Sequence, residues 1–242
     1  MRWLTILLRE LIDNYNYFIQ KTRHRIVKKI TESALQNLDI ISAIEGAKSS
    51  AIFEKKNLRN TKTFKTRKEL FEHCLNAIDH PGLHLEFGTY KGNSINILAK
   101  LRPQQKFYGF DSFEGLPETW TMGCRTGAFS IQGKLPPTRE NVELIKGFFD
   151  QTLSPFVELH KTERVAFLHI DCDLYSSTKT ILQTLLPMIT KGTVICFDEF
   201  YNYPEWEEGE YKAFIEFTEA HHIQFEYLGY IRMGSQVAVK IL

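Results

Sequence analysis

The sequence predicts an α/β fold built on a mostly parallel sheet with helices on both faces. From residue 83 onward, short apolar segments typical of buried strands alternate with segments of helical periodicity, the pattern of parallel strands joined by crossover helices. The last two apolar segments, 225–231 and 236–242, have only a short turn between them, which predicts an antiparallel hairpin at one sheet edge. We therefore expect a helical extension or lid at 1–65 and the main domain at 66–242.

The amino-acid composition is that of an ordinary globular protein. The 242 residues are 43% hydrophobic and 24% charged, values that are ordinary for a globular protein with a sizeable core. The formal net charge of +1 gives no basic excess, so no nucleic-acid partner is expected. The four cysteines have neither CxxC nor metal-ligand spacing, and buried reduced thiols fit a cytoplasmic location.

The N-terminal segment has two interpretations. Its apolar run at 3–8 is far shorter than the ~20 residues that span a bilayer, and no signal-peptide cleavage site follows. The helical spacing of its apolar residues favours a helix packed on the body or on a second subunit, hence a homo-oligomer; these residues are Trp3, Ile6, Leu7 and Leu11. The alternative is a peripheral membrane-surface helix, supported by Lys21, Arg23, Arg25, Lys28 and Lys29.

The elements of the main domain follow in order. Thr66, with Glu69 three residues later, has capping-box spacing and starts a helix over 66–78, after a basic, polar linker. The alternating pattern then predicts strands at 83–87, 106–110, 141–146, 164–170 and 192–197, and helices at 93–101, 151–160, 177–189 and 209–221. Ligands of open parallel sheets bind at the carboxyl ends of the strands, so the residues after each strand are the site candidates.

The first strand ends in LEFGTYKGNS. Gly88 and Gly92 allow a tight turn with close backbone approach to a ligand, and Asn93 or Ser94 then begins a helix whose amides favour a negative group. The spacing is GxxxG, whereas nicotinamide-dependent oxidoreductases carry GxGxxG, which disfavours that class. A tight turn without any cofactor is the alternative.

The second strand ends in FDSFEG, about 20 residues after the glycine turn. Asp111 at this position can accept hydrogen bonds from both ribose hydroxyls of a nucleoside. An aspartate at a strand end is also a common turn former, which is the alternative role.

Three acids follow the fourth and fifth strands. Asp171 ends one, and Asp198 and Glu199 end the next, 27 residues further along. Neighbouring strands lie about 4.8 Å apart, so these carboxylates would repel one another unless a cation lies between them. An all-oxygen set suits Mg²⁺, with Mn²⁺ or Ca²⁺ as alternatives. Asp173 would point elsewhere on an extended chain, and capping of the next helix is at least as good an interpretation.

Together, HLEFGTYKGNSI, YGFDSFEGLPETW, NVELIKGFFDQTL, FLHIDCDLYSST and VICFDEF resemble the macrocin O-methyltransferase family from about residue 81 to the C-terminus. These are class I enzymes that use S-adenosyl-L-methionine to methylate sugar hydroxyls. The resemblance implies a Rossmann-like, seven-stranded methyltransferase sheet. It departs from the family at Glu199, where a second aspartate is common, and over the N-terminal helices, which carry no matching motif.

The resemblance also implies roles for particular residues. It places the methionine part of the cofactor near Glu86, Gly88, Thr89, Tyr90, Gly92 and Ser94, and the nucleoside near Asp111, Ser112, Phe113 and Asp150. It places the metal on Asp171, Asp198 and Glu199, with Asp171 also a candidate to remove the proton of the acceptor.

The expected function is thus methylation of a sugar hydroxyl on a glycan or glycosylated natural product, with S-adenosyl-L-methionine and Mg²⁺ or another divalent cation. Two alternatives remain open at this point. One is an O-methyltransferase for a catechol-like diol or a lipid-linked acceptor, and the other is a non-catalytic module that binds a nucleoside or glycan.

Overall fold

A computed structural model describes residues 2–121 and 123–242; the side chains of 2–11, 13, 14, 30 and 32–35 are not described. The chain divides into two compact units, Met1–Glu45 and Gly46–Leu242. The first unit consists of helix α1 (Arg2–Gln36) and the start of α2 (Leu38–Asn57). The predicted contacts of Trp3, Ile6, Leu7 and Leu11 fall on side chains outside the described set. Within the described residues, no helix is long and apolar enough to cross a bilayer.

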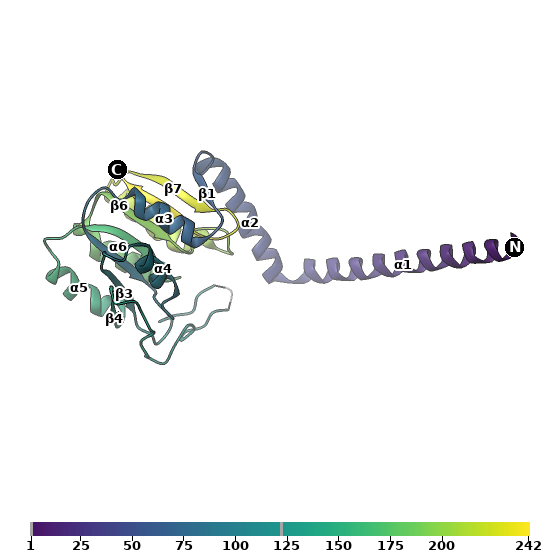
Figure 1. Ribbon diagram of the computed structural model, residues 1–242, viewed down its shortest axis with the longest axis horizontal. Helices are drawn as coiled ribbons and strands as arrows, with labels where there is room; N and C mark the ends of the chain where they lie inside the picture. Colours follow the sequence, from purple (N-terminus) through teal and green to yellow (C-terminus); the bar gives the residue numbers. More distant parts are fainter. Residues whose placement is uncertain (1, 122) are drawn as a thin grey trace. The chain divides into compact units, whose positions relative to one another are not determined.

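The second unit is built on a mixed sheet (Figure 1), in which the described residues form eight strands in the order β1-β7-β8-β6-β5-β2-β3-β4. The strands are β1 (Lys62–Phe64), β2 (Leu83–Phe87), β3 (Phe107–Asp111), β4 (Val142–Lys146), β5 (Val165–Ile170), β6 (Ile189–Phe197), β7 (Phe225–Ile231) and β8 (Val237–Ile241). Only β8 runs antiparallel to its neighbours β6 and β7, which confirms the predicted C-terminal hairpin. The helices of this unit, after the end of α2, are α3 (Arg67–Ala77), α4 (Asn93–Leu101), α5 (Phe149–Leu159), α6 (Tyr175–Leu185) and α7 (Glu210–Ala220).

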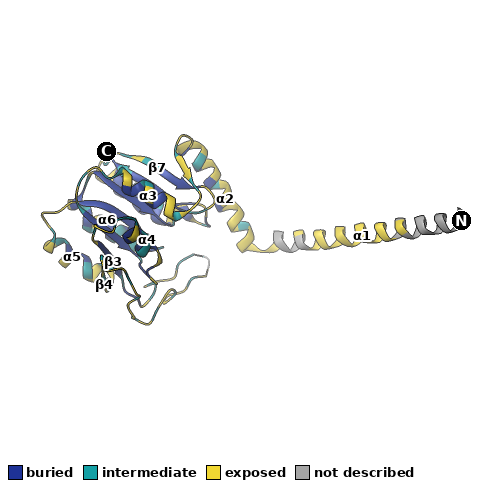
Figure 2. Cartoon of the chain, in the orientation of Figure 1, coloured by how far each residue is buried: buried dark blue, intermediate teal, exposed yellow. Residues whose placement is uncertain are grey.

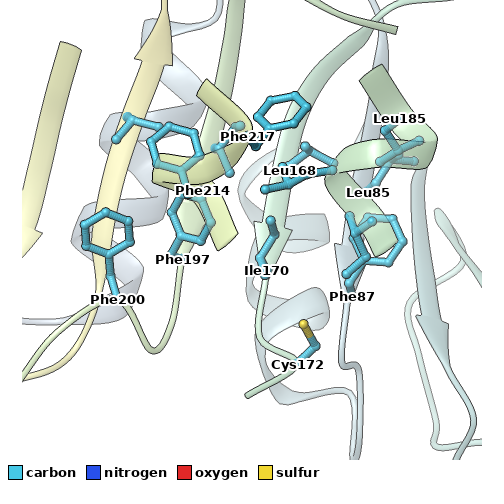
Figure 3. Close-up of a cluster of buried hydrophobic side chains, with 14 of the residues drawn as sticks. Leu85, Phe87, Leu168, Ile170, Cys172, Leu185, Phe197, Phe200, Phe214 and Phe217 are labelled. Atoms are coloured by element: carbon cyan, nitrogen blue, oxygen red, sulfur yellow. The ribbon is translucent and has the colours of Figure 1, made fainter. Parts of the chain in front are cut away.

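The two faces of the sheet bury alternate residues of the same strands. In β5, Leu168 and Ile170 pack toward α5, α6 and α7, whereas Phe167 packs toward α3 and α4. Figure 3 shows the first of these clusters, and Figure 2 shows that the central strands of the sheet are buried. This two-sided burial is why the central strands are continuous apolar runs rather than alternating ones.

One strand lies where none was predicted. β1 is short and polar, and it extends the expected seven-stranded sheet to eight by pairing in parallel with β7. Its Phe64 ring lies over Gly229, where a Cβ atom would come within 2.6 Å of the ring. The sheet unit also begins at Gly46, earlier than the expected boundary at residue 66, because Phe53 and Leu58 are buried in its core. The strand β1 was not predicted because it has only three residues, is polar, and forms by pairing with the distant β7, so its own sequence shows no strand pattern.

The sheet order also fixes where a ligand can bind. The chain leaves β2 toward β3 and β4, then returns to β5 on the other side of β2. The carboxyl ends of β2 and β5 therefore lie side by side at a topological switch point, where open α/β sheets bind their ligands.

His84 on β2 makes stability depend on pH. Its ring is buried between Phe107 and Phe167, and burial lowers its pKa to about 4. The folded state therefore favours the neutral ring, and stability is lost as pH falls from about 6.5 to about 4, by up to about 3 kcal/mol. Chemical denaturation should show a smaller decrease over this pH range for His84→Gln than for the wild type. Parallel pH profiles for the two proteins would contradict this role.

Candidate functional site

A cavity of about 680 Å³ opens at the carboxyl ends of β2, β3, β5 and β6. It lies at the switch point, and its walls come from the segments that follow these strands. The Gly88 turn and Asp111 line one part, and Asp171, Asp198 and Glu199 line another. The five candidate positions from four separate stretches of sequence thus converge on one cavity.

Gly88 brings the ends of β2 and β5 into direct contact. Its φ is +91°, and a Cβ atom there would lie 1.6 Å from the carbonyl oxygen of Asp171, so a side chain has no room. The Asp171 amide in turn donates to Phe87 at 2.9 Å, which continues the strand pairing beyond both ends. The glycine therefore holds the turn and the acid at a fixed separation.

Seven of the ten predicted cofactor residues line the cavity within the described chain: Gly88, Thr89, Tyr90, Ser94, Asp111, Ser112 and Asp150. The other three lie beside it in supporting positions. Gly92 is the left-handed residue before α4, with φ of 78°, and Phe113 is fully buried. Glu86 is fully buried and accepts a hydrogen bond from the Ser94 hydroxyl at 3.1 Å.

Asp111 joins two loops of the cavity wall. Its Oδ2 accepts from the Tyr90 amide and its Oδ1 from the Phe113 amide, both at 2.6 Å. Burial raises the pKa of Asp111, although these amides act in the opposite direction. An ionised carboxylate has about four acceptor positions, so capacity remains to accept from a hydroxyl group of a ligand. The turn-forming role and the ligand-binding role are compatible.

The acids after β5 and β6 form two overlapping groups. Oxygen or nitrogen atoms of His169, Asp171 and Asp198 lie within 4.8 Å of one another, and so do oxygens of Asp171, Asp173 and Glu199. Asp171 belongs to both. The predicted trio of Asp171, Asp198 and Glu199 therefore lies in one region, divided between the two groups. Each group also contains a residue that the sequence interpretation did not assign to the metal, His169 in one and Asp173 in the other.

Asp173 does not cap the following helix, which was the favoured interpretation. The N-cap of α6 is Leu174, and no side-chain capping bond is found there within the described residues. Asp173 has φ of +65°, so the chain reverses at this residue instead of staying extended. This reversal places its carboxylate beside Asp171 and Glu199.

Arg67 brings a positive charge to this cluster. Its guanidinium donates to Asp198 Oδ2 at 2.5 Å and lies 3.7 Å from Asp171 Oδ2. The arginine is the first residue of α3, held by Thr66, whose hydroxyl accepts from the Glu69 amide at 3.2 Å. The predicted capping is thus confirmed, and it positions Arg67, a residue to which the sequence interpretation gave no role in the site.

His169 is buried, as expected of a core histidine, but it also forms part of the site. Its Nδ1 lies 2.9 Å from Glu86, and its Nε2 lies 3.7 Å from Asp198 Oδ1. Burial opposes the charged ring, but the carboxylates of Asp198 and Glu86 outweigh it, so the pKa of His169 is raised well above its usual range. When protonated, His169 adds a second positive charge beside Asp198 and Glu86.

Glu210 is the site residue that the sequence interpretation missed. It lies fully buried at the start of α7, and its two oxygens accept from the amides of Cys172 at 3.3 Å and Glu199 at 3.2 Å. Burial raises its pKa well above the usual range. Glu210 thereby ties together the segments after β5 and β6. An acid in an amphipathic helix gives no signal for this role.

The cluster contains more carboxyl groups than the two basic side chains, Arg67 and His169, can neutralise. Burial raises the pKa of Asp171 and Glu199 well above the usual range and that of Asp173 to about 7. Asp198 is the exception: contacts with His169 and Arg67 outweigh its burial and lower its pKa. Asp198 Oδ1 and Glu199 Oε2 are buried atoms with no hydrogen-bond partner among the described residues. This donor set and these unpartnered oxygens fit a hard divalent cation.

Aromatic side chains form the rest of the wall. Tyr90, Trp120, Phe129 and Phe148 line the cavity. The aromatic residues after β6, in contrast, pack in the core: Phe200, Tyr201, Tyr203 and Trp206. Trp120 and Phe129, which line the cavity, lie in the long loop after β3. Because that loop follows the carboxyl end of a strand, the sequence could have indicated these aromatic residues as well.

Comparisons with known proteins find similar methyltransferases. Residues 85–200 match the family model described as a methyltransferase domain. A curated relative from Streptomyces olivaceus is 28% identical over 146 residues, covering 50% of this chain and 53% of the relative. It is named 8-demethyl-8-(2,3-dimethoxy-alpha-L-rhamnosyl)-tetracenomycin-C 4'-O-methyltransferase. The chain thus spans about half the length of the curated relative that it matches.

Two solved structures share the fold. The calicheamicin methyltransferase CalS11 superposes with a TM-score of 0.59 and 22% identity, over 72% of this chain and 77% of that one. The O-methyltransferase NovP gives a TM-score of 0.54 and 21% identity, over 72% and 78%. These findings confirm the predicted resemblance and the Rossmann-like methyltransferase fold.

Proposed function

We propose that this chain, in which residues 85–200 form a methyltransferase domain, transfers a methyl group from S-adenosyl-L-methionine to a sugar hydroxyl. The observation that carries the proposal is the pairing, in one cavity, of Asp111 beside the glycine turn with an acidic cluster on the opposite side of that turn. The name of the Streptomyces relative, which contains a rhamnosyl group, supports a sugar as the acceptor.

The cofactor would lie along the glycine turn. The free acceptor positions of Asp111 suit the ribose hydroxyls, and the amides at the start of α4 suit the methionine carboxylate. Asp150, in the first turn of α5, lines the same cavity and would lie on the nucleoside side. This arrangement would direct the sulfonium methyl group toward Asp171, which neighbours Gly88.

The acceptor would occupy the part between the acids and the aromatic wall. The apolar faces of sugar rings pack on aromatic side chains, and Trp120 and Phe129 offer such faces. A divalent cation held by the acidic cluster would lower the pKa of an acceptor hydroxyl. Asp171, which belongs to both groups of acids and faces the cavity, would accept the hydroxyl proton. The oxygen would then attack the methyl carbon as the bond from that carbon to sulfur breaks, leaving S-adenosylhomocysteine.

Asp111→Ala should weaken S-adenosyl-L-methionine binding about 10- to 100-fold, because two hydrogen bonds to an ionised carboxylate are lost. Isothermal titration calorimetry measures this directly. Glu114→Ala is the matched control, since Glu114 is an exposed acid on the same loop outside the cavity lining. Unchanged affinity in a folded Asp111→Ala protein would remove Asp111 from cofactor binding.

Asp171→Asn should reduce methyl transfer by at least about 100-fold, because the amide accepts no proton from the hydroxyl. Cofactor affinity should stay within about threefold of the wild type. The measurement uses labelled S-adenosyl-L-methionine with nucleotide-linked deoxysugars as acceptors. Full turnover by this variant would exclude Asp171 as the base, and cofactor binding without transfer to any sugar or diol by the wild type would favour a non-catalytic binding module.

We also propose that α1 binds an anionic membrane surface. Ile12, Tyr15, Ile19 and Ile26 have helical spacing and are all exposed. Five Lys and Arg residues lie at 21–29, and the sequence has no Asp or Glu from 14 to 31. An exposed apolar stripe beside concentrated positive charge suits anionic lipid headgroups, whereas two copies of the basic segment would repel each other in a dimer.

Co-sedimentation should show binding to vesicles that contain phosphatidylserine and little binding to phosphatidylcholine alone, with a decrease at high salt. Replacing both Tyr15 and Ile19 by Glu should abolish this binding. Ile52→Glu is the control, because Ile52 is an exposed apolar residue of α2 outside this stripe. Self-association through α1 without vesicle binding would overturn the proposal in favour of a second copy of the chain.

A further inference from the structure

We infer that Tyr203 is a positioning residue for the acceptor, because its ring supports Trp120 from the core side and fixes the face that the indole presents to the cavity. The support of Trp120 by Tyr203 depends only on contacts within the chain. The effect on acceptor binding rests on the proposed function, in which a sugar ring packs on Trp120.

Trp120 lies in the long loop between β3 and β4, and backbone hydrogen bonds close the base of this loop. The Leu116 amide donates to the Ala128 carbonyl, and the Gly127 amide donates to the Leu116 carbonyl, both at 2.9 Å. Trp120 lies beyond this closure, where its amide donates to the Cys124 carbonyl at 2.8 Å. The backbone bonds fix the base of the loop, so the orientation of the indole ring depends on what the tip of the loop contacts.

Two contacts join this tip to other elements of the cavity wall. The Trp120 and Tyr203 rings lie 5.8 Å apart, centroid to centroid, at an angle of 57°. Aromatic pairs attract each other at separations of about 4.5 to 7 Å. The exposed Glu118 carboxylate accepts from the Ser176 hydroxyl, in the first turn of α6, at 2.5 Å. Because Trp120 packs against the core and also lines the cavity, a displacement of Tyr203 would change the cavity wall.

Tyr203 is itself held firmly on both its backbone and its side chain. It is only 8% exposed and lies in the irregular segment after β6. The adjacent Asn202 amide donates to the Ser50 hydroxyl of α2 at 2.8 Å, and a Cβ atom at Gly46 of α2 would lie 2.5 Å from the Tyr203 carbonyl oxygen. A Cβ atom at Gly209 would collide with the Tyr203 hydroxyl oxygen, so the phenol occupies the room that this glycine leaves. Tyr203 thus offers Trp120 a fixed support.

The ring of Tyr203, and not its hydroxyl, provides this support. The hydroxyl oxygen is a buried atom with no hydrogen-bond partner among the described residues. Tyr203→Phe should therefore preserve the position of Trp120, whereas Tyr203→Leu removes the aromatic contact and keeps most of the apolar volume. Tyr201→Leu is the matched control, because Tyr201 is a buried tyrosine of the same segment whose ring packs with Phe53 and Tyr230.

The first test is ¹⁹F NMR of the full chain labelled with 5-fluorotryptophan. The sequence has three tryptophans, so the Trp120 resonance is assigned by its loss in Trp120→Phe. Tyr203→Leu should shift this resonance, whereas Tyr203→Phe and Tyr201→Leu should leave it near the wild-type position. Gly46→Ala keeps every aromatic ring, displaces the Tyr203 carbonyl and should shift the same resonance, so the test does not depend on Tyr203→Leu folding. An unchanged resonance in the folded variants, or an equal shift in Tyr201→Leu, would overturn the inference.

The second test is methyl transfer to nucleotide-linked deoxysugars, with dTDP-L-rhamnose as the first probe. Tyr203→Leu should raise the KM for the sugar at least about 10-fold and leave kcat and S-adenosyl-L-methionine affinity within about threefold of the wild type, and Tyr203→Phe should restore the KM. A decrease in kcat alone, or an equal rise in KM for Tyr201→Leu, would overturn the positioning role. If the wild type methylates no sugar while the Trp120 resonance still responds to Tyr203→Leu, the proposed function alone is rejected.

Discussion

Buried negative charge at the carboxyl ends of β5 and β6 is the constraint on which the rest of this site depends. Asp198, Glu86 and Glu210 are buried there, and the partly buried Asp171, Asp173 and Glu199 lie beside them at the edge of the cavity. An uncompensated buried carboxylate is costly and shifts its pKa upward, as Asp171 and Glu199 do. Such a cluster persists only when the surrounding structure holds it in place.

The surrounding structure supplies that support from both faces of the sheet. On one face, α3 delivers Arg67 to Asp198, and His169 links Asp198 to Glu86 and through it to Ser94 of the glycine turn. On the other face, α7 delivers Glu210, which fixes the amides after both strands. The residues that position the acids thus also reach the turn proposed to hold the cofactor, so the two halves of the cavity share one rigid support.

Sequence patterns predicted what depends on local structure. Apolar runs located the central strands, and the rule for open sheets identified Gly88, Asp111, Asp171 and Asp198 as neighbours of one cavity. Features set by distant contacts escaped prediction: β1 depends on pairing with β7, and Glu210 depends on amides supplied by two other segments.

Backbone geometry explains the remaining difference. Asp173 was misjudged because an extended chain was assumed where φ is positive, and no residue pattern in FLHIDCDLYSST reveals that reversal.

The alternation of side chains along β5 and β6 explains how neighbouring acids acquire different roles. The Asp198 side chain points toward α3, where it meets Arg67, whereas the amide of the next residue, Glu199, is held by Glu210 of α7. His169, two residues before Asp171, lies on the α3 face, where its ring packs edge-on against Phe71. Asp198 therefore lies directly beside Arg67 and His169, whereas the oxygens of Glu199 lie closest to Asp171 and Asp173.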